Sequence, residues 1–340
     1  MEYRFQPETD YPEQEAEELS ERLLENYQYI HYSNLNQCNY AQFLKYVIKR
    51  PSEPSEGSIR RHAMRDEGVT IWKRIGARFN GLFGDGTKQM ALDKDKAAAE
   101  IEAQRRYSKA ISVYKKELID YYDRLDYYET LLHQGDPDTT CDYFNYVLRS
   151  DQFSIDTFSE YEIVSDVFSY NPQTGVLEVS YRIPKDDEIP AISRFVYDMD
   201  TDELIGQEFA NKTTIKNHKQ NLARALLLRA AATIHISDEA STVKTIIMYG
   251  YLFLGGTASE RPLRKLVIKA TFPCDLIEKI SPENLEIAKF FKEDIKATEV
   301  AGLYVKDPFE LGDLPYVAPP KKASDSKPTS KQGNTEKLLI

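Results

Sequence analysis

The sequence predicts an α+β protein in which a long, charged helical N-terminal half precedes one compact domain with a mainly antiparallel sheet and packed helices. Two observations support this prediction. Apolar residues at heptad spacing end at Leu132, and a helix stop follows at Gly135, Asp136 and Pro137. Beyond the stop, helical periodicity gives way to β-rich segments separated by Pro and Gly turns.

The first 57 residues are expected to form an acidic helical N-terminus. An amphipathic helix with glutamates on its outer face is predicted by apolar residues spaced by four and three, namely Leu19, Leu23, Tyr27 and Ile30. A second, shorter helix is expected at 40–49. Pro51 and Pro54 predict that an exposed loop follows at 51–57.

Residues 58–88 reverse the charge balance, with seven Lys and Arg against three acidic residues. Ile71, Ile75 and Phe79 share one helical face with Leu82 and Phe83. Basic amphipathic helices often contact nucleic acid or anionic surfaces, and aromatic rings can stack on bases. The candidate nucleic-acid-binding residues are Arg60, Arg61, Arg65, Trp72, Lys73, Arg74 and Arg78. The alternative is a helix that docks its apolar face on neighbouring helices and leaves its charges in solvent.

The clearest periodic signal predicts a coiled-coil seam on a long helix at about 88–132. Its eight positions alternate Tyr with Ile or Leu: Tyr107, Ile111, Tyr114, Leu118, Tyr121, Leu125, Tyr128 and Leu132. We call these eight residues the seam. The stretch 105–116 is basic and 117–129 is acidic, which favours an antiparallel partner. That partner is either the chain's own 19–30 helix or a second molecule.

The α+β domain is predicted at 137–304, with a helix at 139–148 leading into the sheet. Strands are expected at 161–170 and 176–183 around the Pro and Gly turn 171–175, and a third at 192–197. A strongly apolar helix at 215–236 should be buried against the sheet. A second hairpin is expected at 243–254 and 263–272, and a closing helix at 282–292.

The predicted division of the chain therefore has four parts: 1–57 is the acidic helical N-terminus, 58–136 is the basic segment with the coiled-coil arm, 137–304 is the α+β domain, and 305–340 is a disordered tail. The tail prediction follows from its prolines and the loss of large apolar residues after Val317.

Composition excludes several classes of protein. A formal net charge of −11 argues against a surface that grips nucleic acid over its whole extent. No apolar stretch approaches the roughly 20 residues that a membrane span needs, and the N-terminus has no secretory signal pattern, so we expect a cytoplasmic chain. The three cysteines, Cys38, Cys141 and Cys274, are far apart and read as free thiols.

No catalytic constellation is evident in the sequence. There is no phosphate-binding loop ahead of a helix, no nucleophile elbow and no histidine pair at metal-binding spacing. Asp186, Asp187 and Glu188 are expected to form a solvated acidic turn, and His235 a satisfied core residue. We therefore expect no metal, no cofactor and no enzyme activity.

From about Cys141 to Lys292 the chain resembles the central module of bacterial Mrr-like restriction endonuclease proteins. The resemblance is carried by Tyr143-Phe144, Val147-Leu148-Arg149-Ser150, Tyr170 to Gly175, Leu177, Val179, Tyr181, Ile183-Pro184, Ile189-Pro190, Arg229, Asp238, Gly250 and Pro282. In those proteins a nuclease domain follows the module, whereas here the chain continues into the Pro and Lys tail. The resemblance implies a role around DNA restriction or phage defence without nuclease activity.

These observations lead to two main functional hypotheses, and a nuclease that uses scattered carboxylates is a third, minor one. The first is a non-enzymatic assembly or targeting subunit of a bacterial restriction, anti-phage defence or DNA-processing system. Its arm would bind a nuclease or ATPase of the same system, or a second copy of the chain. The alternative is a protein that binds nucleic acid directly through the basic segment 60–78.

Overall fold

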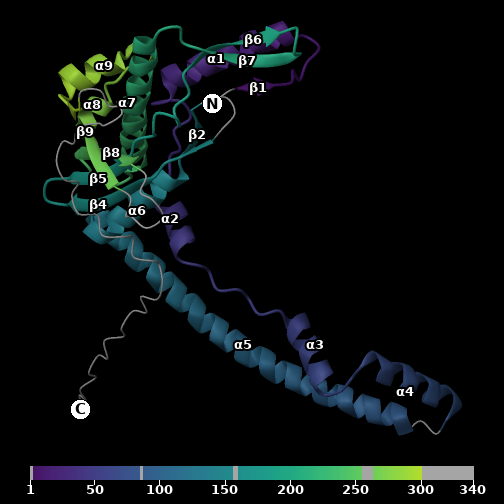
Figure 1. Ribbon diagram of the computed structural model, residues 1–340. Helices are drawn as coiled ribbons and strands as arrows, with labels where there is room; N and C mark the ends of the chain where they lie inside the picture. The colour runs from purple at the N-terminus through teal and green to yellow at the C-terminus, as the bar shows by residue number, and fades with distance from the viewer. Residues whose placement is uncertain (1–2, 85–86, 156–159, 255–262, 301–340) are drawn as a thin grey trace, which may run out of the picture. The chain divides into compact units, whose positions relative to one another are not determined.

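The computed structural model describes residues 3–84, 87–155, 160–254 and 263–300 (Figure 1). The chain divides into two compact units, one made of residues 1–37 and 144–340 and the other of residues 38–143. This division differs from the four parts predicted above because the N-terminal residues fold with the sheet-containing part of the chain. The predicted tail at 305–340 lies outside the described residues.

A small sheet in the first unit explains why the N-terminus belongs there. Strands β1 (Arg4–Phe5), β7 (Glu203–Glu208) and β6 (Ile192–Asp198) pair antiparallel, with Arg4 opposite Ile205. Helix α1 (Pro12–Tyr29) packs Leu19 and Leu23 against this sheet. The apolar face that the sequence offered as a partner for the seam is thus occupied within its own unit.

The larger sheet of this unit has the strand order β10-β9-β8-β5-β4. Its strands are β4 (Ser165–Asn171), β5 (Val176–Arg182), β8 (Thr245–Leu254), β9 (Leu263–Pro273) and β10 (Thr298–Glu299). All neighbours are antiparallel except β5 and β8, which are parallel. The α+β class and the two predicted hairpins are therefore confirmed. Residues 255–262, which connect β8 to β9, lie outside the described residues.

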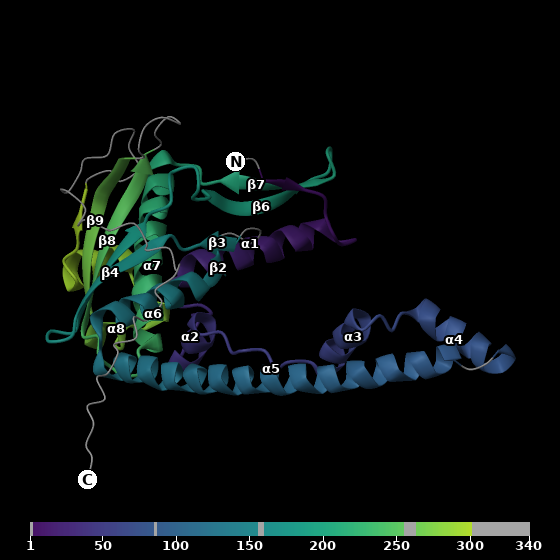
Figure 2. The same cartoon turned by 90° about the horizontal axis from the view of Figure 1, so that it is seen from below.

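Helix α7 (Lys212–Ser237) lies along this larger sheet (Figure 2). Leu226, Leu227 and Ile234 are fully buried, and burial continues around most of the helix circumference. The scarcity of polar residues in this span predicted a core helix, and the observed burial agrees with that prediction. The predicted span 215–236 is confirmed and extends three residues further towards the N-terminus.

The C-terminal elements depart from the expected closing helix at 282–292. The chain instead forms α8 (Cys274–Ile277), a 3₁₀ turn (Pro282–Asn284), α9 (Ile287–Lys289) and a π-helical turn (Phe290–Asp294). The break occurs because Leu285 is extended, with φ −80° and ψ 111°. Two short strands, β2 (Gln152–Ser154) and β3 (Glu160–Glu162), form a separate ribbon. The strand predicted at 161–170 is therefore divided between β3 in this ribbon and β4 in the larger sheet.

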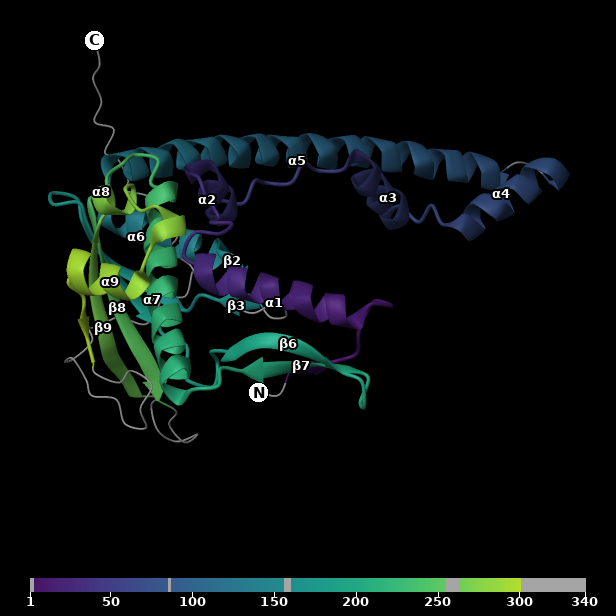
Figure 3. The ribbon, with the colours of Figure 1, turned by 90° about the horizontal axis from the view of Figure 1, so that it is seen from above.

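The second unit is built around one helix, α5 (Thr87–Gln134), which confirms the long helix predicted at 88–132. It also holds α2 (Tyr40–Val47), α3 (Glu56–Asp66), α4 (Ile71–Phe83) and the start of α6 (Pro137–Ser150). Figures 1–3 show α3 and α4 beside the N-terminal part of α5, and an extended segment at 48–55 running along its middle. Gly135 ends α5 with a φ of +66°, and Asp136 then caps α6 through the backbone amide of Thr139.

Candidate functional sites

Helix α4 turns Ala77, rather than Ile71 or Ile75, towards the rest of its unit. Ala77 is 2% exposed and packs with Val69 and Leu92. On the other side of the helix Ile71 is 69% exposed and Trp72 is 78% exposed, with Ile75 at 42%. Ile71 and Ile75 therefore do not dock on neighbouring helices, and the side chains of Phe79, Leu82 and Phe83, the other members of the predicted apolar face, lie outside what the structure describes. Alanine allows close approach to α5, and Ile71, Trp72 and Ile75 are left facing solvent.

The predicted basic patch is partly neutralised by acidic residues of α5. The Arg60 Nε atom lies 2.9 Å from a Glu100 carboxylate oxygen, and Lys73 forms an ion pair with Asp95. Arg61 donates to the Gly57 carbonyl within its own helix, at 3.2 Å. Arg65, Arg74 and Arg78 are exposed, and no ion pair to another described residue involves them. The seven candidates thus lie on α3 and α4 of one unit, and two of their six cations are paired with carboxylates of α5.

A cluster of ion pairs joins α3 to α5 near this patch. Arg106 contacts Asp66 of α3 at 2.6 Å and Glu102 of α5 at 2.7 Å. Hydrogen bonds from Arg105 and Arg106 lower the pKa of Glu102 to about 2. Since Arg105 and Asp66 are exposed and Arg106 and Glu102 are only partly buried, we assign the cluster to orientation of the helices rather than to substantial stabilisation.

The seam is incompletely covered within its own unit. Leu132 is buried, whereas the seven seam residues from Tyr107 to Tyr128 are only half-buried. Beside the seam, Ile119 is 60% exposed and Tyr122 is 49% exposed. An open groove of about 360 Å³ separates α5 from the extended segment at Ser52 and Pro54. That segment therefore leaves apolar surface of α5 accessible.

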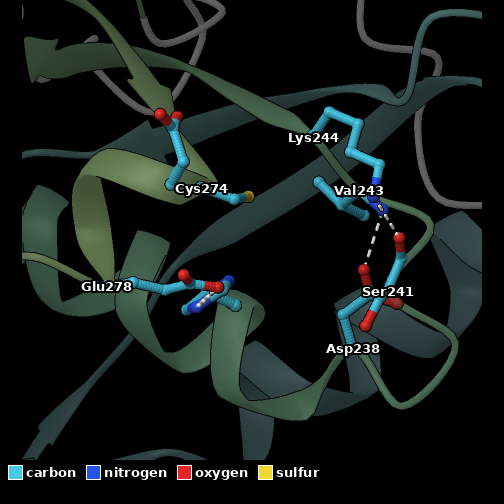
Figure 4. A pocket seen from close by; sticks show the side chains of 8 residues that line it. Asp238, Ser241, Val243, Lys244, Cys274 and Glu278 are labelled. Carbon is cyan, nitrogen blue, oxygen red and sulfur yellow. Dashed lines mark hydrogen bonds and ion pairs between the residues drawn. The ribbon is translucent and has the colours of Figure 1, made fainter.

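A polar pocket of about 330 Å³ lies in the first unit, where α7 ends and β8 begins (Figure 4). Its labelled lining residues are Asp238, Ser241, Val243, Lys244, Cys274 and Glu278. Asp238 accepts a hydrogen bond from the Val243 amide at 2.7 Å, and the Lys244 ammonium donates to the Ser241 carbonyl at 2.8 Å. These groups are engaged in holding the loop between α7 and β8.

The chemistry available in this pocket is limited. The Cys274 sulfur points into it (Figure 4), but burial and then the charge of Asp238 raise the thiol pKa to about 11, so the nucleophilic thiolate is scarce. His235 Nε2 lies 3.6 Å from a Glu278 carboxylate oxygen. Among the described residues, no group of three or more His, Cys, Asp and Glu side chains is arranged to hold a metal ion.

The acidic turn at 186–188 is tied to the fold and is not simply solvated. The Lys219 ammonium lies 3.0 Å from a carboxylate oxygen of Asp186. Glu188 pairs with Arg182 and accepts a hydrogen bond from the Lys185 amide at 2.9 Å. Two of the three acidic side chains therefore have protein partners.

Comparison of the chain with models of known protein families, with curated proteins and with solved structures finds no match. Across the described part of the chain, no helix is both long and apolar enough to cross a membrane. The relation to Mrr-like restriction proteins stays a prediction. Many residues that carry it, such as Leu148, Leu177 and Tyr181, are fully buried and build the core.

Two polar features of the first unit were not predicted from the sequence. The pocket joins residues 235–244 to residues 274–278, and a buried pair joins Arg229 to Asp151. The position of Arg229 could have indicated the pair, since a charge inside an apolar helix requires a buried partner. The sequence did not indicate that the partner would be Asp151, because Asp151 is distant from Arg229 in the sequence.

Proposed function

We propose that the protein is a non-enzymatic assembly or targeting subunit that binds a protein partner through α4. The observation that carries the proposal is the exposed apolar face formed by Ile71, Trp72 and Ile75. We call these three residues the α4 face. Interface cores are enriched in aromatic residues, and an amphipathic helix that lays its apolar face into a groove is a recurring mode of protein recognition.

The surroundings of the α4 face support a partner with an acidic rim. Helix α4 contains no acidic residue, and Arg74 and Arg78 are exposed on the same helix. The seam supports assembly as well, and we propose that it forms an antiparallel coiled coil. Membership of a restriction or phage-defence system is part of the proposal only through the resemblance, and would make the partner a nuclease or ATPase.

The alternative function is direct binding of nucleic acid by the basic segment. Exposure of Arg65, Arg74, Arg78 and Trp72 favours it. The pairing of Arg60 and Lys73 with acidic residues of α5 weakens it, because those carboxylates repel phosphates.

Site-specific photocrosslinking in the native host tests the proposal. A photoreactive phenylalanine analogue replaces Trp72, and a matched control replaces Met199, which is also 78% exposed but lies in the turn between β6 and β7. We expect one discrete protein adduct from position 72 that is absent from position 199. Arg74→Glu with Arg78→Glu should weaken that adduct.

The other outcomes decide between the hypotheses. A nuclease-sensitive adduct at position 72, together with oligonucleotide affinity that falls steeply with salt, would replace the proposal with the nucleic-acid alternative. Identical adduct patterns at positions 72 and 199, or none at either, would contradict the assignment of the α4 face as a docking surface.

A further inference from the structure

The seam has an internal symmetry that determines what can cover it. Ile111, Leu118, Leu125 and Leu132 occupy one of the two core positions of the heptad, and the four tyrosines occupy the other. When two such helices pair antiparallel, each core layer places the first core position of one helix opposite the second core position of the other. A second copy of α5 would therefore place every aliphatic residue opposite a tyrosine.

We propose that α5 pairs with α5 of a second copy of this chain as an antiparallel coiled coil, with the two-fold axis between Ile119 and Asp120. This deepens the proposed function at the seam. The four distinct layers of the pair are Tyr107 with Leu132, Ile111 with Tyr128, Tyr114 with Leu125, and Leu118 with Tyr121. This single register uses all eight seam residues and leaves none without a counterpart.

Charge selects this orientation over the parallel one. Residues 105–116 contain five Lys and Arg and no acidic residue, whereas residues 117–129 contain five acidic residues and one Arg. A parallel pair would set the basic stretch against its own copy along its whole length. The antiparallel register sets it against the acidic C-terminal half of the partner helix.

One ion pair follows directly from this register. Glu117 and Arg124 occupy the same flanking position of successive heptads, and both are exposed in the single chain. In the antiparallel pair, Glu117 of each copy lies opposite Arg124 of the other. The same two residues lie about 10 Å apart on one helix, too far to neutralise each other.

The single chain leaves room for the second helix. The seam residues from Tyr107 to Tyr128 are half-buried, and Glu117 lines the open groove beside the extended segment. Tyr122, at 49% exposure, flanks the seam and would come to lie beside Lys115 of the second copy. Half-buried core positions with exposed apolar flanks are the expected appearance of one strand of a coiled coil viewed alone.

The pairing has a consequence for the α4 face. Helix α4 precedes the N-terminal end of α5, so an antiparallel pair carries two α4 faces at opposite ends. At 1.5 Å per residue, the two copies of Thr87 lie roughly 100 Å apart. A dimer of this kind is a bivalent scaffold, which binds a partner with two sites more tightly than a monomer does.

Sedimentation of charge-swap variants of the full chain tests the inference. Wild type should have twice the 39.2 kDa chain mass. Glu117→Arg alone and Arg124→Glu alone each place like charges opposite each other twice, and should raise the dimer Kd at least about tenfold. An equimolar mixture of the two variants should form a heterodimer, and the Glu117→Arg, Arg124→Glu double variant should restore the wild-type dimer. Leu118→Asp with Leu125→Asp should give a monomer that keeps its helical circular dichroism.

Two results would overturn the inference. One is a wild type that stays monomeric at tens of micromolar. The other is a dimer that tolerates both charge swaps and the Leu118→Asp, Leu125→Asp variant, which would place the interface elsewhere. The photocrosslink at Trp72 does not depend on α5 pairing, so failure of this inference and failure of the proposed function are distinguishable.

Discussion

Arg229 and Asp151 form a bidentate ion pair that is completely buried in the first unit. The Arg229 Nε and Nη2 atoms lie 2.8 Å and 2.7 Å from the two Asp151 carboxylate oxygens, and both side chains are 0% exposed. Arg229 also donates to the Ile30 and Ser33 carbonyls, each at 2.7 Å. One guanidinium therefore joins α7, the end of α6 and the segment that follows α1.

The first prediction concerns this pair. Arg229→Met should cost about 3–5 kcal/mol of unfolding free energy, because it leaves the Asp151 carboxylate buried without a counter-charge. Adding Asp151→Leu removes the stranded charge and should recover at least half of the loss. Urea denaturation measures both changes, with exposed Arg194→Met as the control. A loss below about 1 kcal/mol for Arg229→Met would show that the buried pair does not hold these elements together.

The second prediction is a loss of stability in mild acid. Burial, with the charge of Arg229 next, lowers the pKa of His31 from 6.5 to about 4, and burial also lowers the pKa of His218 to about 4. Between pH 6.5 and about 4 the unfolded chain binds up to two protons that the folded chain does not. Stability from these groups is fully present above pH 6.5 and falls as pH approaches 4, by up to about 1.4 kcal/mol per pH unit per histidine.

Denaturation at several pH values checks this prediction. His31→Phe should remove about one proton from the slope between pH 6.5 and pH 4, and His218→Phe should do the same. Slopes are compared rather than absolute stabilities, because His218 also contacts the Pro190 carbonyl at 3.2 Å. Unchanged slopes in both variants would mean that these histidines titrate normally in the folded protein.

The third prediction concerns the turn between β4 and β5. Gly175 has a φ of +66°, and an added Cβ would lie 2.7 Å from Lys244 Cγ and 2.8 Å from the Thr242 carbonyl oxygen. Gly175→Ala should therefore cost about 3 kcal/mol, combining backbone strain with a clash. Gly68→Ala is the matched control, since Gly68 has a φ of +69° and open space around it. Thermal unfolding measures both variants. Equal stability losses for Gly175→Ala and Gly68→Ala would show that the turn shifts enough to relieve the clash.

The fourth prediction tests the chemistry of the polar pocket. With a thiol pKa of about 11, Cys274 should react with iodoacetamide at pH 8 roughly 100-fold more slowly than a cysteine in an unstructured peptide. Mass spectrometry of the Cys274 peptide over time measures the rate, which should rise as pH approaches 11. Alkylation at the rate of the unstructured peptide would restore Cys274 as a candidate nucleophile.

Long elements with strong periodicity were predictable from the sequence, and short ones were not. The bounds of α5 and α7 lie within a few residues of the predicted bounds, because many side chains in each helix contribute to its apolar pattern. β1 and β10 have two residues each and no period of their own. Their existence depends on distant partners, as in the pairing of Arg4 with Ile205. No local pattern encodes such pairings.

The candidate sites could be predicted from the sequence only where they consist of a helical pattern. The seam and the apolar face of α4 are helical patterns, so the sequence located them. The sequence did not reveal which side of α4 would face solvent, because Ala77 rather than Ile71 makes the contact with the unit. Nor did it reveal that Glu100 and Asp95 neutralise part of the basic patch, since each ion pair joins separate helices.

Disulfide formation between differently tagged chains reports whether two copies of α5 pair antiparallel in the proposed register. Ile111→Cys chains mixed with Tyr128→Cys chains should form a mixed disulfide dimer under mild oxidation, because these positions share a core layer in the proposed register. Neither variant should cross-link to itself, since identical positions would lie about 25 Å apart along the axis. Wild type measures any background from Cys38, Cys141 and Cys274. Self-cross-linking of Ile111→Cys without the mixed product would show that the two α5 helices pair parallel and would overturn the proposed register.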